Sequence, residues 1–160
     1  RLVCGDMRNI PLGDGVVAGH YCLFNSFGYY SHEDNDRILS EWSRTLAPGG
    51  RLILQIPNRP VMAKITREFA PSQMLTHDFS MTEAYEYNDE KKQMMGRGLW
   101  QFESEQHPWN FELFLYSSGE MKKKVSKAGL KTIECFEDYD ETEFNPRSSP
   151  EMILVCEKSS

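Results

Sequence analysis

Polar side chains that could bind a ligand follow apolar, strand-like segments in this chain. Asp6 comes at the end of the segment 1–5, and Asn25 and Ser26 follow the apolar run 19–24. The carboxyl ends of parallel strands meet at one edge of a sheet, and ligands of open α/β proteins bind at that edge. The sequence therefore predicts a binding site that these three side chains share.

A second group of candidates lies further along the chain. Asn58 and Arg59 follow the apolar segment 52–56 and are expected on the same rim, where they would contact a substrate. For Arg59, a salt bridge to an acidic surface is an equally good interpretation. Tyr29, in a loop marked by Gly28, either lines a pocket or packs against the core.

Two histidines are candidates for a general base. His77 and His107 lie in the middle of the chain, and an imidazole titrates near neutral pH. The spacing of histidines and cysteines gives no set of metal ligands, so no metal site is predicted. The four cysteines form no Cys-x-x-Cys pair and stand in or beside apolar runs. Free thiols in a reducing compartment fit this pattern, which predicts a cytoplasmic protein.

Composition excludes several partners. The net charge of -6 argues against nucleic acid, because binding to its backbone relies on an excess of Lys and Arg. No apolar run reaches the roughly 20 residues that a membrane-spanning helix needs. Apolar residues make up 39% of the chain, which is enough for one folded domain covering residues 1–160.

The segment 44–59 shows how the candidate residues are positioned. It reads as the end of a helix that begins at a Ser31 capping box, then a stop at Pro48, a reversal at 49–50, and the strand 52–56. The uninterrupted apolar character of that strand predicts cover on both faces. Helix, stop and buried strand form one unit of a doubly wound α/β sheet.

The segment 61–116 interrupts this alternation and reads as a β-rich insertion. Turns are predicted at 88–90 and at 96–98. We expect a short helix, a hairpin and one more strand, at 61–69, 83–88 with 92–103, and 110–116. Its aromatic residues either line an apolar pocket or form a satellite core, which is the simpler account: Trp100, Phe102, Trp109, Phe111 and Phe114.

The last part of the chain returns to the α/β pattern. Ser117 and Glu120 form a capping box that opens a helix, and Gly129 ends it. Strands follow at 131–136 and 151–156. Their direct connection predicts an antiparallel final pair.

The order of these signals resembles the class I S-adenosylmethionine-dependent methyltransferases that act on small molecules. The resemblance rests on Gly-Asp-Met-Arg at 5–8, Asn-Ser-Phe-Gly-Tyr at 25–29 and Leu-x-Pro-Gly-Gly-Arg-Leu at 46–52, and it continues to the last strand. It implies the C-terminal part of a Rossmann-like sheet, with residues 19–24 as its fourth strand. The family's Gly-rich cofactor turn is absent from this chain.

The resemblance also implies roles for the candidate residues. Asp6 would accept a hydrogen bond from the adenine amine of S-adenosylmethionine, and the Met7 backbone would contact the ring. The methyl-bearing end of this cofactor would lie beside Asn25, Ser26 and Phe27. The insertion 61–116 would form the side of the site that holds a small-molecule acceptor, together with Tyr29, Asn58 and Arg59.

In the family's strand order, the strand 19–24 has a further neighbour on its outer side. Without that neighbour its edge is apolar and unpaired. We therefore expect a preceding N-terminal half, in the same polypeptide or in a partner chain, or a homodimer that covers the edge. The alternative function is a non-catalytic, methyltransferase-like binding or regulatory subunit.

Overall fold

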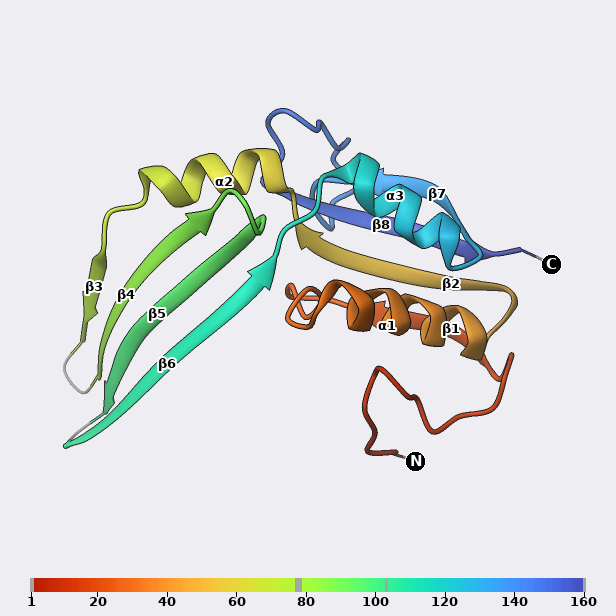
Figure 1. The fold of residues 1–160 in the computed structure, drawn as a ribbon, viewed down its shortest axis with the longest axis horizontal. Coiled ribbons are helices and arrows are strands. Elements are labelled where there is room, and N and C mark those ends of the chain that lie inside the picture. The colour runs from red at the N-terminus through yellow and green to blue at the C-terminus, as the bar shows by residue number, and fades with distance from the viewer. Residues whose placement is uncertain (1, 77–78, 103, 160) are drawn as a thin grey trace.

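The computed structural model describes residues 2–76, 79–102 and 104–159, which form two four-stranded sheets (Figure 1). The first sheet has the strand order β1-β2-β8-β7. Its strands are β1 (Val17–Cys22), β2 (Leu46–Pro57), β7 (Leu130–Phe136) and β8 (Glu151–Lys158). β1 is parallel to β2, whereas β8 is antiparallel to both β2 and β7. The predicted antiparallel pair is therefore confirmed.

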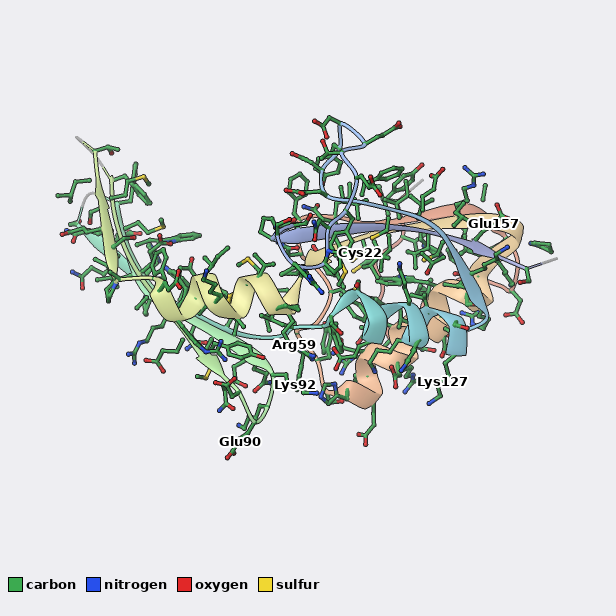
Figure 2. The ribbon with its side chains drawn as sticks, turned by 90° about the horizontal axis from the view of Figure 1, so that it is seen from above. Cys22, Arg59, Glu90, Lys92, Lys127 and Glu157 are labelled. Carbon is green, nitrogen blue, oxygen red and sulfur yellow. The ribbon has the colours of Figure 1, made fainter. Side chains whose placement is uncertain are left out.

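Two helices pack on the same side of this sheet, as Figure 2 shows from above. α1 (His32–Thr45) begins where the Ser31 hydroxyl accepts a hydrogen bond from the Asp34 N–H. α3 (Ser118–Lys127) begins with the complete capping box of Ser117 and Glu120. Both starts agree with the sequence, because a cap replaces the missing partners of the first N–H groups.

The core lies between these helices and one face of the first sheet. Its most deeply buried members are aliphatic and sulfur-containing side chains: Ile38, Leu39, Leu52, Leu54, Met121, Val125, Met152, Leu154 and Cys156. The opposite face is less covered, since Ile53 is half-buried and the Tyr21 side chain is 73% exposed. The prediction that both faces of segment 52–56 are covered holds in part: α1 and α3 lie on the same side, yet Gln55 on the opposite face is buried, and Ile53 there is half-buried.

The Pro-Gly-Gly segment does not form a loop separate from the strand. β2 begins at Leu46, directly after α1, and includes Pro48–Gly50. Gly49 has a φ of +73°, and the pairing with β1 shifts there, from Val17 opposite Leu46 to Gly19 opposite Arg51. The predicted reversal is therefore an irregularity within a longer strand.

The N-terminal segment differs from its prediction as a strand end. Leu2 is fully exposed, Val3 is 57% exposed, and residues 2–5 pair with no strand among the described residues. A strand needs a hydrogen-bonded neighbour, and β1 is turned toward β2 instead. Within the described part of the chain, β1 pairs with β2 alone, so its outer edge is open as expected.

The second sheet is entirely antiparallel and projects from the end of the first (Figure 1). A helix, α2 (Arg59–Glu68), leads into it. Its strands are β3 (Ser72–Leu75), β4 (Phe79–Asn88), β5 (Gln93–Phe102) and β6 (Glu105–Phe114). The turn between β4 and β5 is confirmed, whereas β3 was not predicted from the sequence.

The predicted turn at 96–98 is wrong, because these residues lie in the middle of β5. A Cβ at Gly96 would overlap the Phe111 ring, and a Cβ at Gly98 would lie 2.7 Å from Trp109 Cε2. The glycines are therefore needed for space and not for a turn, because aromatic rings from β6 lie across β5.

Candidate functional site

A cavity of about 380 Å³ lies where the two sheets meet. It adjoins the loop after β1, the last residue of β2, one face of α2, and the second sheet. Its lining residues are Phe24, Asn25, Tyr29, Pro57, Met62, Ile65, Thr66, Phe69, Tyr85, Met94, Phe111 and Leu113. The cavity is thus at the carboxyl end of the parallel pair β1 and β2, where the sequence predicted a site.

Aromatic rings form one wall of the cavity. Phe69 meets Tyr85 edge to face, with ring centroids 5.0 Å apart. Trp109 stacks behind Phe111 at 6.0 Å, with planes inclined by 12°. Tyr29 meets the other edge of Phe111 at 6.0 Å. These pairs hold the rings in fixed orientations, which gives the wall a defined shape.

Two tyrosines are the titratable groups among the residues that line the cavity. Burial raises the pKa of Tyr29 above its ordinary value. Burial, together with the hydrogen bond that the Tyr85 hydroxyl donates to Glu83 at 2.9 Å, raises the pKa of Tyr85 to about 12. Both hydroxyls are therefore protonated near neutral pH and neither serves as a base.

Asn25 is held at the cavity by a hydrogen-bond network. Its Nδ2 donates to Glu151 Oε1 at 2.9 Å, and Gln55 Nε2 donates to the other oxygen of Glu151. Gln55 Oε1 accepts from the Phe24 N–H at 2.8 Å. Phe24 and Asn25 have positive φ values of 54° and 57°, which residues other than glycine seldom adopt. The network therefore fixes a strained backbone at the site. Ser26, the next residue, donates its hydroxyl to the Leu23 carbonyl at 2.8 Å.

The Asp6 turn lies at the start of α1. The Asp6 carboxylate accepts hydrogen bonds from the backbone and side chain of Arg8, which lower its pKa to about 2. The Arg8 guanidinium also reaches Asp34 at 3.4 Å and lies over the Tyr30 ring at 4.7 Å. Arg8 therefore connects this turn to the start of α1 and to the loop that follows β1.

Of the predicted site residues that the structure describes, Asn25 and Tyr29 line the cavity, whereas the others do not: Asp6, Met7, Ser26, Phe27, Asn58, Arg59 and His107. Phe27 is 1% exposed, with its ring packed between Trp42 and Tyr116, so only its backbone is free for a ligand. Asn58 is fully buried before α2. Its Nδ2 donates to the carbonyls of residues 146 and 149, at 3.1 and 2.8 Å. Arg59 forms a salt bridge with Glu120 at 2.7 Å, the second of its two interpretations.

Of the two candidate bases, the structure places His107 away from the cavity. His107 lies near the distal end of β6, where its Nε2 is 3.4 Å from Glu105, and its side chain is 59% exposed. His77 lies outside the described residues. The other two histidines have structural contacts, because His20 bonds to Thr45 at 2.7 Å and His32 packs on Phe114 at 4.2 Å.

The sequence placed the segment 61–116 on the acceptor side of the site, but none of the residues in or next to α2 that line the cavity was singled out as a site residue. Met62, Ile65 and Phe69 line the cavity and recur at helical spacing, which was the available signal. An apolar stripe on a helix usually packs into the protein core, and only the tertiary structure shows that this one faces a cavity. Of the aromatic residues proposed for a pocket, Phe111 lines the cavity and Trp109 supports it, whereas Trp100 and Phe102 are about half exposed.

The described part of the chain offers neither a metal cluster nor a membrane-spanning helix. No three His, Cys, Asp or Glu side chains there are grouped to hold a metal ion. None of the helices described is both long enough and apolar enough to cross a membrane.

No family model and no curated protein matches the sequence. Solved structures match the fold. An S-adenosylmethionine-dependent methyltransferase from Clostridium acetobutylicum has a TM-score of 0.89 at 13% identity, over 100% of this chain and 65% of its own. The CcbJ methyltransferase from Streptomyces caelestis has a TM-score of 0.80 at 17% identity, over 99% of this chain and 63% of its own.

A third match is an amino pentose methyltransferase from Micromonospora echinaspora, solved with its cofactor bound. Its TM-score is 0.66 at 17% identity, over 97% of this chain and 63% of its own. The chain thus spans slightly under two thirds of the length of these proteins. Its first sheet has the strand order expected for strands four, five, seven and six of the predicted sheet. The chain therefore has the Rossmann-like fold of the class I S-adenosylmethionine-dependent methyltransferases, over part of that fold's length.

Proposed function

We propose that this chain forms the adenine edge and the acceptor side of an S-adenosylmethionine-dependent methyltransferase that acts on a small molecule. One observation carries the proposal: a cavity of about 380 Å³ lies at the carboxyl end of β1 and β2, under the second sheet. Its size is in the range of small-molecule sites. The fold shared with methyltransferases supports the choice of reaction.

The residues at the N-terminal turn fit the adenine part of the cofactor. An exocyclic amine needs a hydrogen-bond acceptor, and the Asp6 carboxylate is ionised and 44% exposed. Met7 and Ile10 are half-buried and pack against the main core, so the turn is anchored. When bound, S-adenosylmethionine supplies an activated methyl group. Asp6 would orient its base, and Asn25 and Ser26 would face its reactive end.

The protein's contribution to methyl transfer is mainly positional. The apolar cavity excludes water and holds the acceptor in one orientation, which lowers the entropic part of the barrier. Near neutral pH, none of the described lining residues is a general base. The acceptor's proton therefore leaves to solvent or to another part of the whole protein.

The second candidate function is a non-catalytic binding or regulatory subunit. The open edge of β1 favours it, because a subunit that supports a partner needs a free interface. In either case we propose that a complementing N-terminal half or a second copy covers this edge. We also propose a cytoplasmic location, which suits the buried free thiols of Cys22 and Cys156.

Calorimetric titration with S-adenosylmethionine tests these functions. We expect micromolar binding by the full-length gene product and much weaker binding by the isolated 160 residues. Asp6→Asn should weaken the binding, whereas Asp14→Asn, an exposed control, should not. No binding by the full-length product would contradict the first function and favour the second.

A further inference from the structure

The cavity between the two sheets carries no charge of its own. Among the described lining residues there is no Lys, Arg, His, Asp or Glu. Four lining side chains are polar: Asn25, Tyr29, Thr66 and Tyr85. The Thr66 hydroxyl donates to a carbonyl of its own helix at 2.7 Å, and the Tyr85 hydroxyl donates to Glu83. Asn25 and Tyr29 therefore remain as the polar groups that can meet a ligand.

Three charged side chains that lie close to lining residues in sequence, or are joined to one by a hydrogen bond, already have partners. Arg59 is paired with Glu120 at 2.7 Å, and Glu151 accepts hydrogen bonds from two amides. Arg67 of α2 pairs with Asp89 and lies over the Tyr87 ring. A charged ligand would lose its water in this cavity and gain no opposite charge, so the lining favours an uncharged molecule.

The shape of the cavity favours a planar group. Tyr85 and Phe111 form one wall, and their rings meet over Gly96, where a side chain would overlap them. Met62 and Ile65 of α2 form another part of the lining. A planar apolar ring gains contact with the aromatic faces and with the flexible thioether.

Tyr29 provides a hydrogen-bonding group. Its hydroxyl makes no hydrogen bond with any described residue, and its ring is fixed edge-on to Phe111. Burial raises its pKa, so it remains a neutral donor and acceptor. Tyr29 is 46% exposed and belongs to the lining of the cavity.

We propose that the methyl acceptor is an uncharged molecule with a planar apolar ring and one polar group that contacts the Tyr29 hydroxyl. That the ligand is a methyl acceptor rests on the proposed function, whereas the preference for an uncharged planar ligand follows from the cavity alone. A protonated amine, a carboxylate or a phosphate ester fits this lining poorly.

Three probes with the same ring system and different charge test the preference. Indole is neutral, tryptamine is a cation and indoleacetate is an anion near neutral pH. In calorimetric titrations of the chain, we expect indole to bind about tenfold tighter than either charged probe. Equal or tighter binding of a charged probe would overturn the proposal.

Two variants in α2 test whether the preference for an uncharged ligand arises in this cavity. Ile65→Glu adds a carboxylate to the lining at a side chain that is already 42% exposed, and should reverse the preference in favour of tryptamine. Lys64→Glu places a carboxylate one residue away, on a side chain that is 73% exposed and outside the lining, and should leave the preference unchanged although it changes the charge by two units instead of one. The same response in both variants would overturn the assignment to this cavity.

Tyr29→Phe tests the polar contact. Loss of one hydrogen bond should weaken indole binding about fivefold, because such a bond contributes roughly 1 kcal/mol. Unchanged binding would overturn the role of Tyr29. The cofactor titration distinguishes the two proposals. If the full-length product binds the cofactor but the chain shows no preference for indole, this inference alone fails. If the chain prefers indole but the full-length product does not bind the cofactor, the proposed function alone fails.

Discussion

The two sheets of this protein are built in different ways. In the first sheet, aliphatic side chains alternate along β2 and β8, and the inner ones are less than 2% exposed under α1 and α3. In the second sheet, fully buried apolar residues are few, and its cluster contains Met94, Leu113 and Leu115. The first sheet is thus organised around a packed core, and the second around a wall of rings.

This difference indicates which sheet contributes most to the free energy of folding and which one determines ligand specificity. Close packing in the first sheet provides stability and leaves little room for a ligand. The second sheet is covered by one short helix, so its aromatic face is partly open, and the cavity lies at the junction. Substitutions in the two sheets should therefore have different consequences.

The largest effect is expected in the first sheet. Leu54→Ala removes a side chain with no exposed surface and should lower the free energy of unfolding by about 2–5 kcal/mol. Trp100→Ala in the second sheet removes a larger side chain that is 48% exposed, and should cost less than about 1 kcal/mol. Urea denaturation followed by circular dichroism measures both. Similar losses would show that the second sheet has a core of comparable density.

The next effect concerns the glycines under the aromatic wall. Gly98→Ala places a Cβ against the Thr82 carbonyl and 2.7 Å from Trp109, and should cost about 1–3 kcal/mol by overpacking. Gly119→Ala in the first turn of α3 meets nothing within 4 Å and provides the control. That variant should be neutral or slightly stabilising, because alanine favours a helix. A harmless Gly98→Ala would contradict the proposed wall geometry.

Local signals predicted the elements of the first sheet well. The cap at Ser31 and the capping box at Ser117 locate both helix starts, because a cap acts within one turn. The antiparallel final pair was predicted from the direct connection between its two strands, and the strand order was implied by the resemblance to the methyltransferases. Cover on the outer face could not be predicted, because an apolar strand such as 52–56 does not show what packs against it.

The position of the site was predicted better than the set of residues that line it. Asn25 and Tyr29 were located from a strand end, and both line the cavity. Asn58 satisfied the same rule, but it holds the connection before β8. A strand-end residue caps or binds according to its tertiary neighbours, which one sequence does not contain. Gly96 was misread as a turn for the same reason, because its neighbour Phe111 lies on another strand.

A smaller effect is expected at the junction between the second sheet and α3. Burial opposes ionisation of Glu120, but hydrogen bonds from Ser117 and Arg59 lower its pKa from 4.5 to about 2. Ionised Glu120 therefore stabilises the fold fully above about pH 4.5, and this stabilisation is lost as the pH falls toward 2.

Glu120→Gln should remove this part of the pH dependence. The side chain is 36% exposed, so solvent screening reduces the difference to about 1 kcal/mol. Denaturation at pH values between 5 and 2 measures it. Glu112→Gln, an exposed carboxylate on β6, serves as the control, and a variant curve parallel to the wild type would refute the role of Glu120.

Substitutions of the exposed aromatic rings should have the smallest effect on stability. They should also distinguish the two sheets most clearly by their effect on self-association. Tyr21 on β1 is 73% exposed beside an open edge, and Trp100 on β5 is 48% exposed between paired strands. Tyr21→Lys and Trp100→Lys should each change the free energy of unfolding by less than about 0.5 kcal/mol.

Their effects on self-association should differ. An open strand edge with apolar neighbours pairs with other chains, and a lysine there opposes the pairing. Tyr21→Lys should therefore reduce any association seen by sedimentation velocity, whereas Trp100→Lys should not. The reverse result would assign self-association to the aromatic face of the second sheet, and would contradict the role of the open edge of β1 in pairing with another chain.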